Sequence, residues 1–215
     1  MINLSNALQD LIDKDAFLCF GLQHKLLNLS QTAKFLVSIL ETRTKKEVTI
    51  SSILMNLSRL QRVYIKKSTQ IESIKIKNLT IHSNISSVTF FRDADINTKI
   101  SQIYKEVQSK NGYMTINQGM NEVTILIEES MYLIVKKYIQ NEPKFYKEKL
   151  AALGIQFDEK YINIPGLIYF LVQQISLQNI NISEVTSTYT EIVFYVDQQN
   201  IRLAFDTIYN RFLQK

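Results

Sequence analysis

The stretch IPGLIYFLVQQISLQNINISEVTSTYTEIVFYVD, residues 164–197, decides the fold of the last third of this chain. Pro165 has the fixed φ of a first helical turn, and Gly166 lets the backbone come close to a neighbouring group. Apolar residues at helical spacing follow, and then come two runs of β-branched and aromatic residues, 181–189 and 191–197. The stretch therefore predicts a helix followed by two strands.

The helix and two strands of this stretch belong to a longer unit that occurs twice in the chain. Strand, helix, strand, strand, helix occurs twice, over about 86–140 and again over about 149–213. An open antiparallel sheet with helices on one face buries such a unit, in the ferredoxin-like α+β arrangement. An alternating run at 72–81 lies outside both repeats, and we expect it to supply an edge strand to one of the two sheets.

The second repeat resembles the ACT domain at the C-terminal end of aspartokinases. The matching features are a loop ending in Pro165-Gly166, the run Asn179-Ile180-Asn181-Ile182, a serine- and threonine-rich strand, a strand ending at Asp197, and a last helix with Ala204 facing inward. Asn179 stands where the family commonly has glycine, and asparagine can adopt the positive φ required there. The first repeat resembles the family in topology only, because its loop reads Arg92-Asp93-Ala94-Asp95.

We predict a site for a free amino acid or similar zwitterion where the loop of the second repeat meets a strand start. Backbone N–H groups at a helix N-terminus favour a carboxylate, and Asn181 can accept from an ammonium group. The predicted ligand-binding residues are Tyr161, Ile162, Asn163, Ile164, Pro165, Gly166, Leu167, Asn181, Ile182 and Ser183. Pro165, Gly166 and Asn181 are equally explained as turn formers, and Tyr161 as an exposed loop or interface residue. The alternative location is the Asp93–Ile96 loop, although acids there also suit a helix start.

The first third of the chain reads as helices. Apolar stripes run through Leu4–Ile12, Phe17–Leu22 and Ala33–Leu40, the last behind Ser30 as a candidate N-cap. Thr49, Ser51 or Ser52 can open a further helix that carries Ile53, Met55, Leu57 and Leu60. Helices joined by a short turn around residues 26–30 resemble the helix-turn-helix class.

Positive charge is concentrated in the same third. Residues 1–69 hold ten Lys or Arg against five Asp or Glu, whereas residues 70–215 hold fifteen of each. A basic segment joined to a neutral module is typical of a polyanion-binding domain, and double-stranded DNA is the expected partner of Lys45, Lys46, Arg59 and Arg62. A helical bundle that serves dimerisation, with its lysines simply solvated, fits the same pattern.

Motifs for catalysis are absent from the sequence. The chain has no Gly-rich phosphate loop and no GxSxG, and the lysine and glycine motifs of an aspartokinase catalytic domain are missing, so we expect no enzyme activity. With one cysteine, Cys19, in an apolar run, and His24 and His82 far apart, we expect neither a metal nor a cofactor. The sequence has neither an apolar run of membrane-spanning length nor a leader-like start, so we expect a cytoplasmic protein without membrane contact.

These observations predict an α+β chain with a helical, helix-turn-helix-like domain at 1–65 and two ACT-like repeats at 70–145 and 146–215. The resemblance implies allosteric regulation and a homodimer, because ACT-type sheets commonly pair side by side. The expected function is a non-catalytic regulator that senses an amino-acid-like ligand and responds through the basic domain, as a transcription regulator. Two rivals remain: a detached regulatory subunit that binds a protein such as an amino-acid biosynthetic enzyme, and a dimerisation scaffold that binds no ligand.

Overall fold

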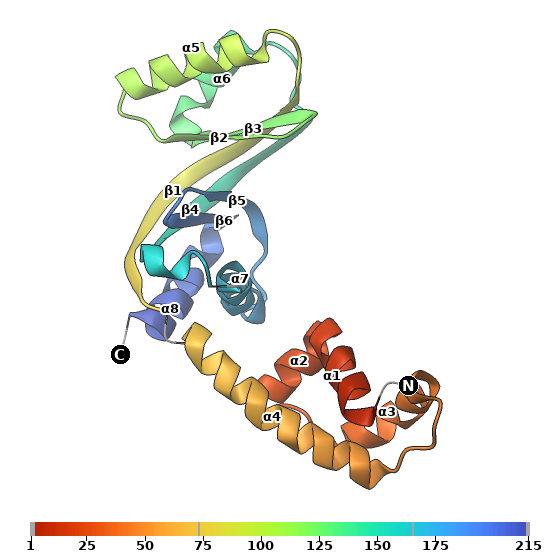
Figure 1. Cartoon of the computed structure of the whole chain (residues 1–215). Helices are drawn as coiled ribbons and strands as arrows, with labels where there is room; N and C mark the ends of the chain where they lie inside the picture. The colour runs from red at the N-terminus through yellow and green to blue at the C-terminus, as the bar shows by residue number, and fades with distance from the viewer. Residues whose placement is uncertain (1–2, 73, 165, 214–215) are drawn as a thin grey trace. The chain divides into compact units, whose positions relative to one another are not determined.

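The computed structural model describes residues 3–72, 74–164 and 166–213. Internal contacts divide the chain into unit 1, residues 1–73, and unit 2, residues 74–215 (Figure 1). The last helix of unit 1 continues to Glu72, so the boundary predicted after residue 65 falls inside a helix. The boundary predicted at 145 and 146 falls at the start of a strand that both repeats use.

Unit 1 is entirely helical in its described part. Its helices are α1 (Leu4–Lys14), α2 (Ala16–Gln23), α3 (Leu29–Thr44) and α4 (Ile50–Glu72). Asn28, not Ser30, caps α3, since its Oδ1 accepts from the backbone N–H groups of Ser30 and Gln31 at 3.1 and 3.2 Å. Thr49 opens α4, because its hydroxyl accepts from the backbone N–H of Ser52 at 3.2 Å.

The predicted stripes of unit 1 form one core, although some of their members lie outside it. The fully buried aliphatic residues are Leu8, Ile12, Leu22, Ala33, Leu36, Leu40, Ile53 and Leu57. Phe17, Phe35 and Met55 are instead 72%, 69% and 58% exposed. Each lies on a helix whose core side is already filled, so the apolar pattern placed them in a helix but on the wrong face.

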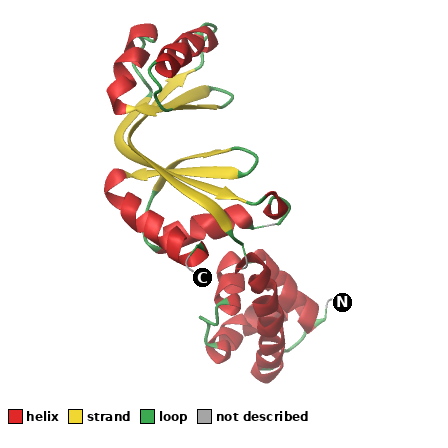
Figure 2. Ribbon diagram, turned by 90° about the vertical axis from the view of Figure 1, so that its left-hand side faces the viewer, coloured by secondary structure: helices red, strands yellow, loops and turns green. Residues whose placement is uncertain are grey.

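Unit 2 is built on a single antiparallel sheet of six described strands. They are β1 (Ile76–Phe91), β2 (Met114–Gln118), β3 (Glu122–Glu128), β4 (Phe145–Phe157), β5 (Ile182–Ser187) and β6 (Glu191–Asp197), in the order β2-β3-β1-β4-β6-β5. Figure 2 shows the sheet curled, with the two outer hairpins, β2–β3 and β5–β6, turned toward each other. We call this inner side of the sheet the concave face.

Strands β1 and β4 each serve both repeats. The second half of β1 pairs with β3 from Ile85 to Phe91, whereas its first half pairs with β4 from Ile76 to His82. The prediction of an extra edge strand is therefore confirmed, with one difference: the runs expected as separate strands at 72–81 and 86–91 form one continuous strand. In the same way the start of β4, from Phe145, completes the sheet of the first repeat.

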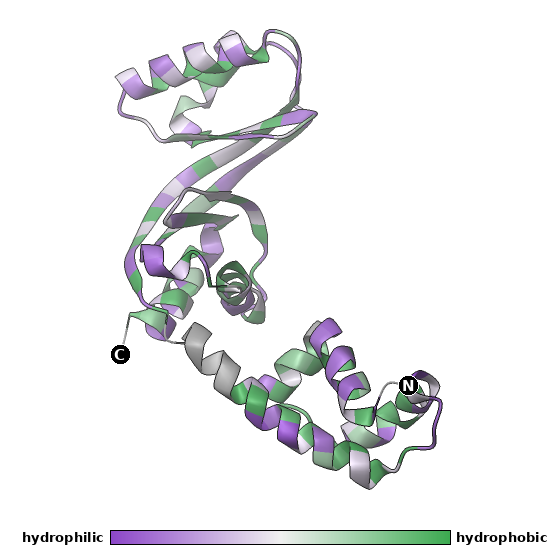
Figure 3. Cartoon of the chain, in the orientation of Figure 1, coloured by the Kyte–Doolittle hydropathy of each residue, from purple (hydrophilic) through white to green (hydrophobic). Residues whose placement is uncertain are grey.

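Helices cover the outer side of the sheet in both repeats (Figure 2). The first repeat carries α5 (Ile96–Ser109), η1 (Glu129–Met131) and α6 (Tyr132–Tyr138); the second carries η2 (Glu159–Tyr161), α7 (Leu167–Leu177), η3 (Gln198–Asn200) and α8 (Ile201–Phe212). In Figure 3, α5 alternates hydrophilic and hydrophobic segments, whereas α7 is coloured mainly as hydrophobic. Asn179, after α7, has φ 56°, which confirms the positive φ expected where the family has glycine.

The two repeats are related by an approximate two-fold axis near Ile85 and Leu150, which pair with each other. Asn84 and Lys149, one residue earlier on each strand, both have positive φ, at 58° and 57°. The backbone N–H of Asn84 donates to Gln198 Oε1 at 2.9 Å, and that of Lys149 donates to Glu129 Oε1 at 2.6 Å. The matching bonds fix one sheet register for both repeats.

Candidate functional site

The predicted loop of the second repeat joins β4 to α7 through the short helix η2. Asp158 opens this segment, since its Oδ1 accepts from the backbone N–H of Lys160 at 3.2 Å. That backbone hydrogen bond and the nearby Lys77 lower the pKa of Asp158. Gly166, directly before α7, has φ 95°, a backbone conformation that residues with a side chain rarely adopt. No described side chain caps this end of α7.

A cavity of about 400 Å³ lies beside this loop, which we call the loop cavity. Its walls are the loop, the first turn of α7 and the turn between β5 and β6. The lining residues are Phe157, Ile162, Ile164, Gly166, Leu167, Ile168, Tyr169, Ser187, Thr188, Tyr189, Glu191 and Ile192. The volume is that of a small-molecule site, and the walls are mainly apolar with hydroxyl groups on the hairpin side.

Four of the predicted loop residues, Ile162, Ile164, Gly166 and Leu167, line the loop cavity. Asn163 is exposed and is not part of the lining, and Pro165 lies outside the described residues. Tyr161 was expected to be exposed, but it is 6% exposed and its hydroxyl accepts from the backbone N–H of Lys75 at 3.2 Å. That bond ties the loop to the start of unit 2.

The predicted strand start does not join this cavity. Ile182 pairs with Val196, whereas Ser187, five residues on, pairs with Ile192 near the loop. Five residues of extended chain span about 17 Å, so Asn181, Ile182 and Ser183 lie at the opposite end of β5. Ser183 accepts there from Lys147 Nζ at 3.0 Å.

The loop cavity is lined by Ser187 to Tyr189 where Asn181 to Ser183 were predicted, and sequence reasoning missed these residues. Strand direction was the available signal, because in an antiparallel pair the turn after β5 returns to the end of the sheet where β4 stops. The backbone N–H of Phe157 donates to the carbonyl of Thr190 at 3.0 Å, which joins that turn to the start of the loop.

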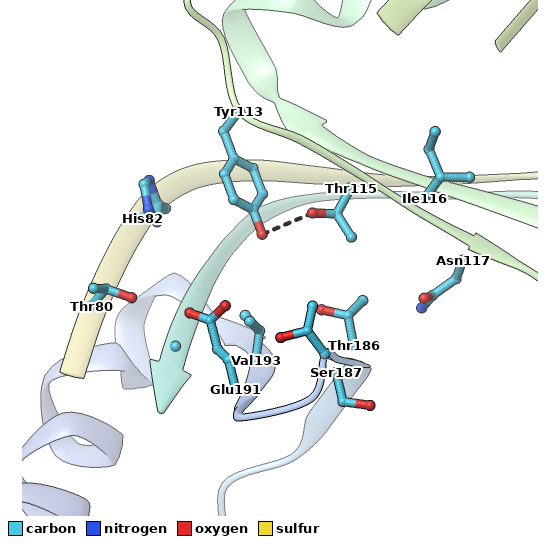
Figure 4. A pocket seen from close by; sticks show the side chains of 12 residues that line it. Thr80, His82, Tyr113, Thr115, Ile116, Asn117, Thr186, Ser187, Glu191 and Val193 are labelled. Atoms are coloured by element: carbon cyan, nitrogen blue, oxygen red, sulfur yellow. Dashed lines mark hydrogen bonds between the residues drawn. The ribbon is translucent and has the colours of Figure 1, made fainter. Parts of the chain in front are cut away.

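A second cavity, of about 360 Å³, lies on the concave face between the two hairpins (Figure 4). We call it the inter-repeat cavity. Six residues define its character: Thr80, His82, Tyr113, Thr115, Gly154 and Glu191. The hydroxyl of Tyr113 bonds to that of Tyr195 at 2.5 Å and accepts from Thr115 at 3.2 Å, so the two repeats are hydrogen-bonded at this point. Burial, the main cause, raises the pKa of Tyr195.

The basic residues predicted to bind DNA are all exposed on unit 1. Arg59 and Arg62 are one turn apart on the side of α4 away from its buried residues, and Met55 and Val63 share that exposed side. Lys45, which ends α3 with φ 55°, and Lys46 lie in the α3–α4 connection. By helical rise, Arg59 is about 13 Å along α4 from its first residue, so the four cations form two separate pairs.

Solved structures similar to this chain are regulatory parts of aspartate kinases. The regulatory subunit from Thermus thermophilus, in a ligand-free form, matches with a TM-score of 0.51 and 11% identity, covering 65% of this chain and 98% of that one. The subunit from Thermus flavus matches with a TM-score of 0.51 and 8% identity, covering 64% and 98%. Unit 2 therefore has the fold of aspartokinase regulatory (ACT) domains.

The whole aspartate kinase of Clostridium acetobutylicum, described as an allosteric enzyme, is similar with a TM-score of 0.52 and 16% identity. That match covers 64% of this chain, which spans about a third of the enzyme, 35% of its length. No family model matches the sequence, and no curated protein matches it. The helix-turn-helix assignment of unit 1 stays a prediction.

Two further findings concern metal ions and membranes. Among the described residues, no three His, Cys, Asp or Glu side chains gather where they could hold a metal ion. No helix in the described part of the chain is long and apolar enough to cross a bilayer.

Proposed function

We propose that this chain is a non-catalytic regulatory protein whose unit 2 binds a free amino acid or similar zwitterion in the loop cavity. The observation that carries the proposal is the cavity of about 400 Å³ at a helix start that no described side chain caps, on a fold shared with aspartokinase regulatory subunits. The N-terminus of α7 suits the ligand carboxylate. Hydroxyls of Ser187 and Thr188 and the carboxylate of Glu191 are the acceptors for its ammonium group.

Thermal unfolding of the full chain with each of the twenty amino acids tests this proposal. A ligand that binds only the folded chain stabilises it by roughly 2.7 kcal/mol at ~100-fold excess over its Kd, so the binding amino acid raises the Tm. If none of the twenty shifts the Tm, the scaffold function replaces the sensor function.

Two variants locate the site. Gly166→Val cannot keep φ 95° and should remove the Tm shift. Ile168 is 59% exposed on the first turn of α7, so Ile168→Glu should preserve the fold while its carboxylate competes for the helix end; Ile168→Gln is the uncharged control. A shift that survives Gly166→Val and Ile168→Glu would move the site to the Asp93–Ile96 loop.

For the output of the sensor we propose that unit 1 binds double-stranded DNA through its phosphates. Support comes from the exposed Arg59 and Arg62 on one side of α4 and from the basic excess of this unit. Affinity should fall steeply between about 50 and 200 mM salt, and Arg59→Ala with Arg62→Ala should weaken it. The matched control removes two exposed cations from unit 2, Lys105→Ala with Arg202→Ala.

A detached regulatory subunit is the competing function, because the similar Thermus proteins are regulatory subunits matched over 98% of their length. Absence of DNA binding at about 50 mM salt, together with a complex formed with an amino-acid biosynthetic enzyme, would favour it. Under both functions we propose a homodimer, which the exposed Ile168, Tyr169 and Leu177 on α7 support. Sedimentation at several concentrations measures its formation.

A further inference from the structure

The inter-repeat cavity differs from the loop cavity in the groups that line it. Figure 4 shows the Glu191 carboxylate, the Thr80 hydroxyl and the Tyr113 ring turned toward one space, with Thr115 and Thr186 on the hairpin side. His82 stacks on Tyr113 with the ring centroids 4.8 Å apart. The cavity is therefore lined mainly by hydroxyl groups and contains one carboxylate.

Glu191 supplies the only formal charge in this lining. Its carboxylate forms no ion pair or hydrogen bond with any side chain that the structure describes, and no lysine or arginine is among the lining residues. A half-buried carboxylate without a cation is costly to keep ionised unless a ligand supplies the opposite charge. The cavity thus has one carboxylate and, among its lining residues, no lysine or arginine to pair with it.

The first repeat shows the same sheet positions filled. In the common register, Glu191 corresponds to Glu122, Gly154 to Thr89 and His82 to Lys147. Glu122 is ion-paired with Lys144. Thr89 has a side chain where the second repeat has none, and its hydroxyl bonds to that of Thr124 with the two oxygens 2.8 Å apart. In the first repeat, therefore, a lysine of the chain neutralises the carboxylate, and a threonine stands at the position of the glycine.

Gly154 keeps the corresponding space open in the second repeat. A Cβ atom on Gly154 would lie 2.3 Å from Thr80 Oγ1 and 3.2 Å from Glu191 Oε1. Any side chain at this position would displace the two polar groups that face the cavity. The absence of a side chain at Gly154 thus leaves room for the hydroxyl of Thr80 and the carboxylate of Glu191 to face the cavity.

We propose that the inter-repeat cavity binds a small primary ammonium compound that carries no carboxylate group. The ammonium group takes the place that Lys144 Nζ occupies beside Glu122, donating to Glu191 and to hydroxyl oxygens such as that of Thr80. A zwitterion is disfavoured, because its carboxylate would lie close to Glu191 and the lining contains no lysine or arginine to pair it. This site goes beyond the amino-acid site of the loop cavity and differs from it in ligand charge.

Calorimetric titration of the full chain with ethanolamine and propylamine tests the proposal, with β-alanine as the probe of similar size that adds a carboxylate. One amine is expected to bind per chain, and β-alanine is expected not to bind at this site. Glu191→Gln should weaken amine binding by about tenfold to a hundredfold, because it removes a charged hydrogen-bond partner. Glu122→Gln, the matched change in the first repeat, should leave it unchanged.

Glu191 also lines the loop cavity, so two further variants separate the sites. Thr80→Val removes a hydroxyl that lines the inter-repeat cavity and not the loop cavity, so it should weaken amine binding and leave any amino-acid Tm shift in place, whereas Ile168→Glu should do the reverse. Circular dichroism establishes that each variant is folded. No heat with either amine up to about 10 mM, or binding unaffected by Glu191→Gln, would overturn the proposal.

Discussion

The two repeats of unit 2 share a sheet register but place different groups at equivalent positions. At the end of the concave face, the first repeat has Thr89 and the Glu122–Lys144 pair, while the second has Gly154 and a Glu191 that pairs with no described cation. The shared strands β1 and β4 fix the backbone of both repeats. Side chains can therefore vary from one repeat to the other without changing the fold.

The helix pairs differ in the same way. In the first repeat Glu106 accepts from Lys137 Nζ at 2.7 Å and from the Tyr138 hydroxyl at 2.9 Å, which joins α5 to α6. In the second repeat Phe170 meets Phe212 edge to face, with centroids 5.5 Å apart, between α7 and α8. The first helix pair thus adds a charged network to its apolar core, whereas the second adds an aromatic pair.

The largest effect is expected from substitutions in the core, which test whether the two repeats unfold together or independently. Phe194 and Ile125 occupy equivalent, fully buried positions. Phe194→Ala should cost about 3–5 kcal/mol and Ile125→Ala about 2–5 kcal/mol of unfolding free energy. Because β1 and β4 run through both repeats, either change should reduce amide hydrogen-exchange protection in both. Loss of protection confined to the mutated repeat would show that they unfold independently.

An intermediate effect is expected at Gly154. Gly154→Ala should destabilise by about 1–3 kcal/mol, because the new methyl group overlaps Thr80 Oγ1. Thr80→Ala in the same chain removes that oxygen and should recover most of the loss, measured as urea unfolding midpoints of the single and double variants. In the first repeat, Thr89→Ala removes only the bond to Thr124 and should cost about 1 kcal/mol. A neutral Gly154→Ala would mean that its neighbours adjust freely.

The smallest effect is expected in the charged helix pair. Hydrogen bonds from Lys137 and then Tyr138 hold the pKa of Glu106 below its ordinary value. A lowered folded-state pKa stabilises the fold above the ordinary glutamate pKa, and that contribution is lost as pH falls through the folded-state pKa. Glu106→Gln should therefore be slightly less stable than the parent at pH 7, and the difference should vanish in acid. Phe170→Leu, in the other helix pair, should show no such pH dependence in the same urea titrations.

Element types were predictable because their signals are local. Alternation of apolar and polar residues predicted the strands, and apolar residues at helical spacing predicted α5 to α8. Asn179 likewise predicted the positive φ that the structure shows at its position. The burial of Tyr161 was not predictable, because the partner of its hydroxyl, Lys75, lies 86 residues away in the chain. Its position between Lys160 and Ile162 predicts an exposed loop or interface residue instead.

The candidate site was predictable in part for the same reason. The loop Ile162–Leu167 is one continuous segment, and four of its residues line the loop cavity. Asn181 to Ser183 are close to α7 in sequence but are carried to the far end of the sheet by the direction of β5. Which end of a strand meets a loop depends on pairing, and pairing joins residues distant in the chain.

Neighbouring residues alone account for the helical first third, the doubled order of strands and helices, and the glycine-containing loop. Contacts between distant residues are needed to show that both repeats share β1 and β4 and that the hairpins face each other across a cavity. Gly154, Thr80 and Glu191 are distant in sequence and none stands in a motif. Their meeting follows from the register of three strands, which is set by long-range pairing and the burial of one face of the sheet.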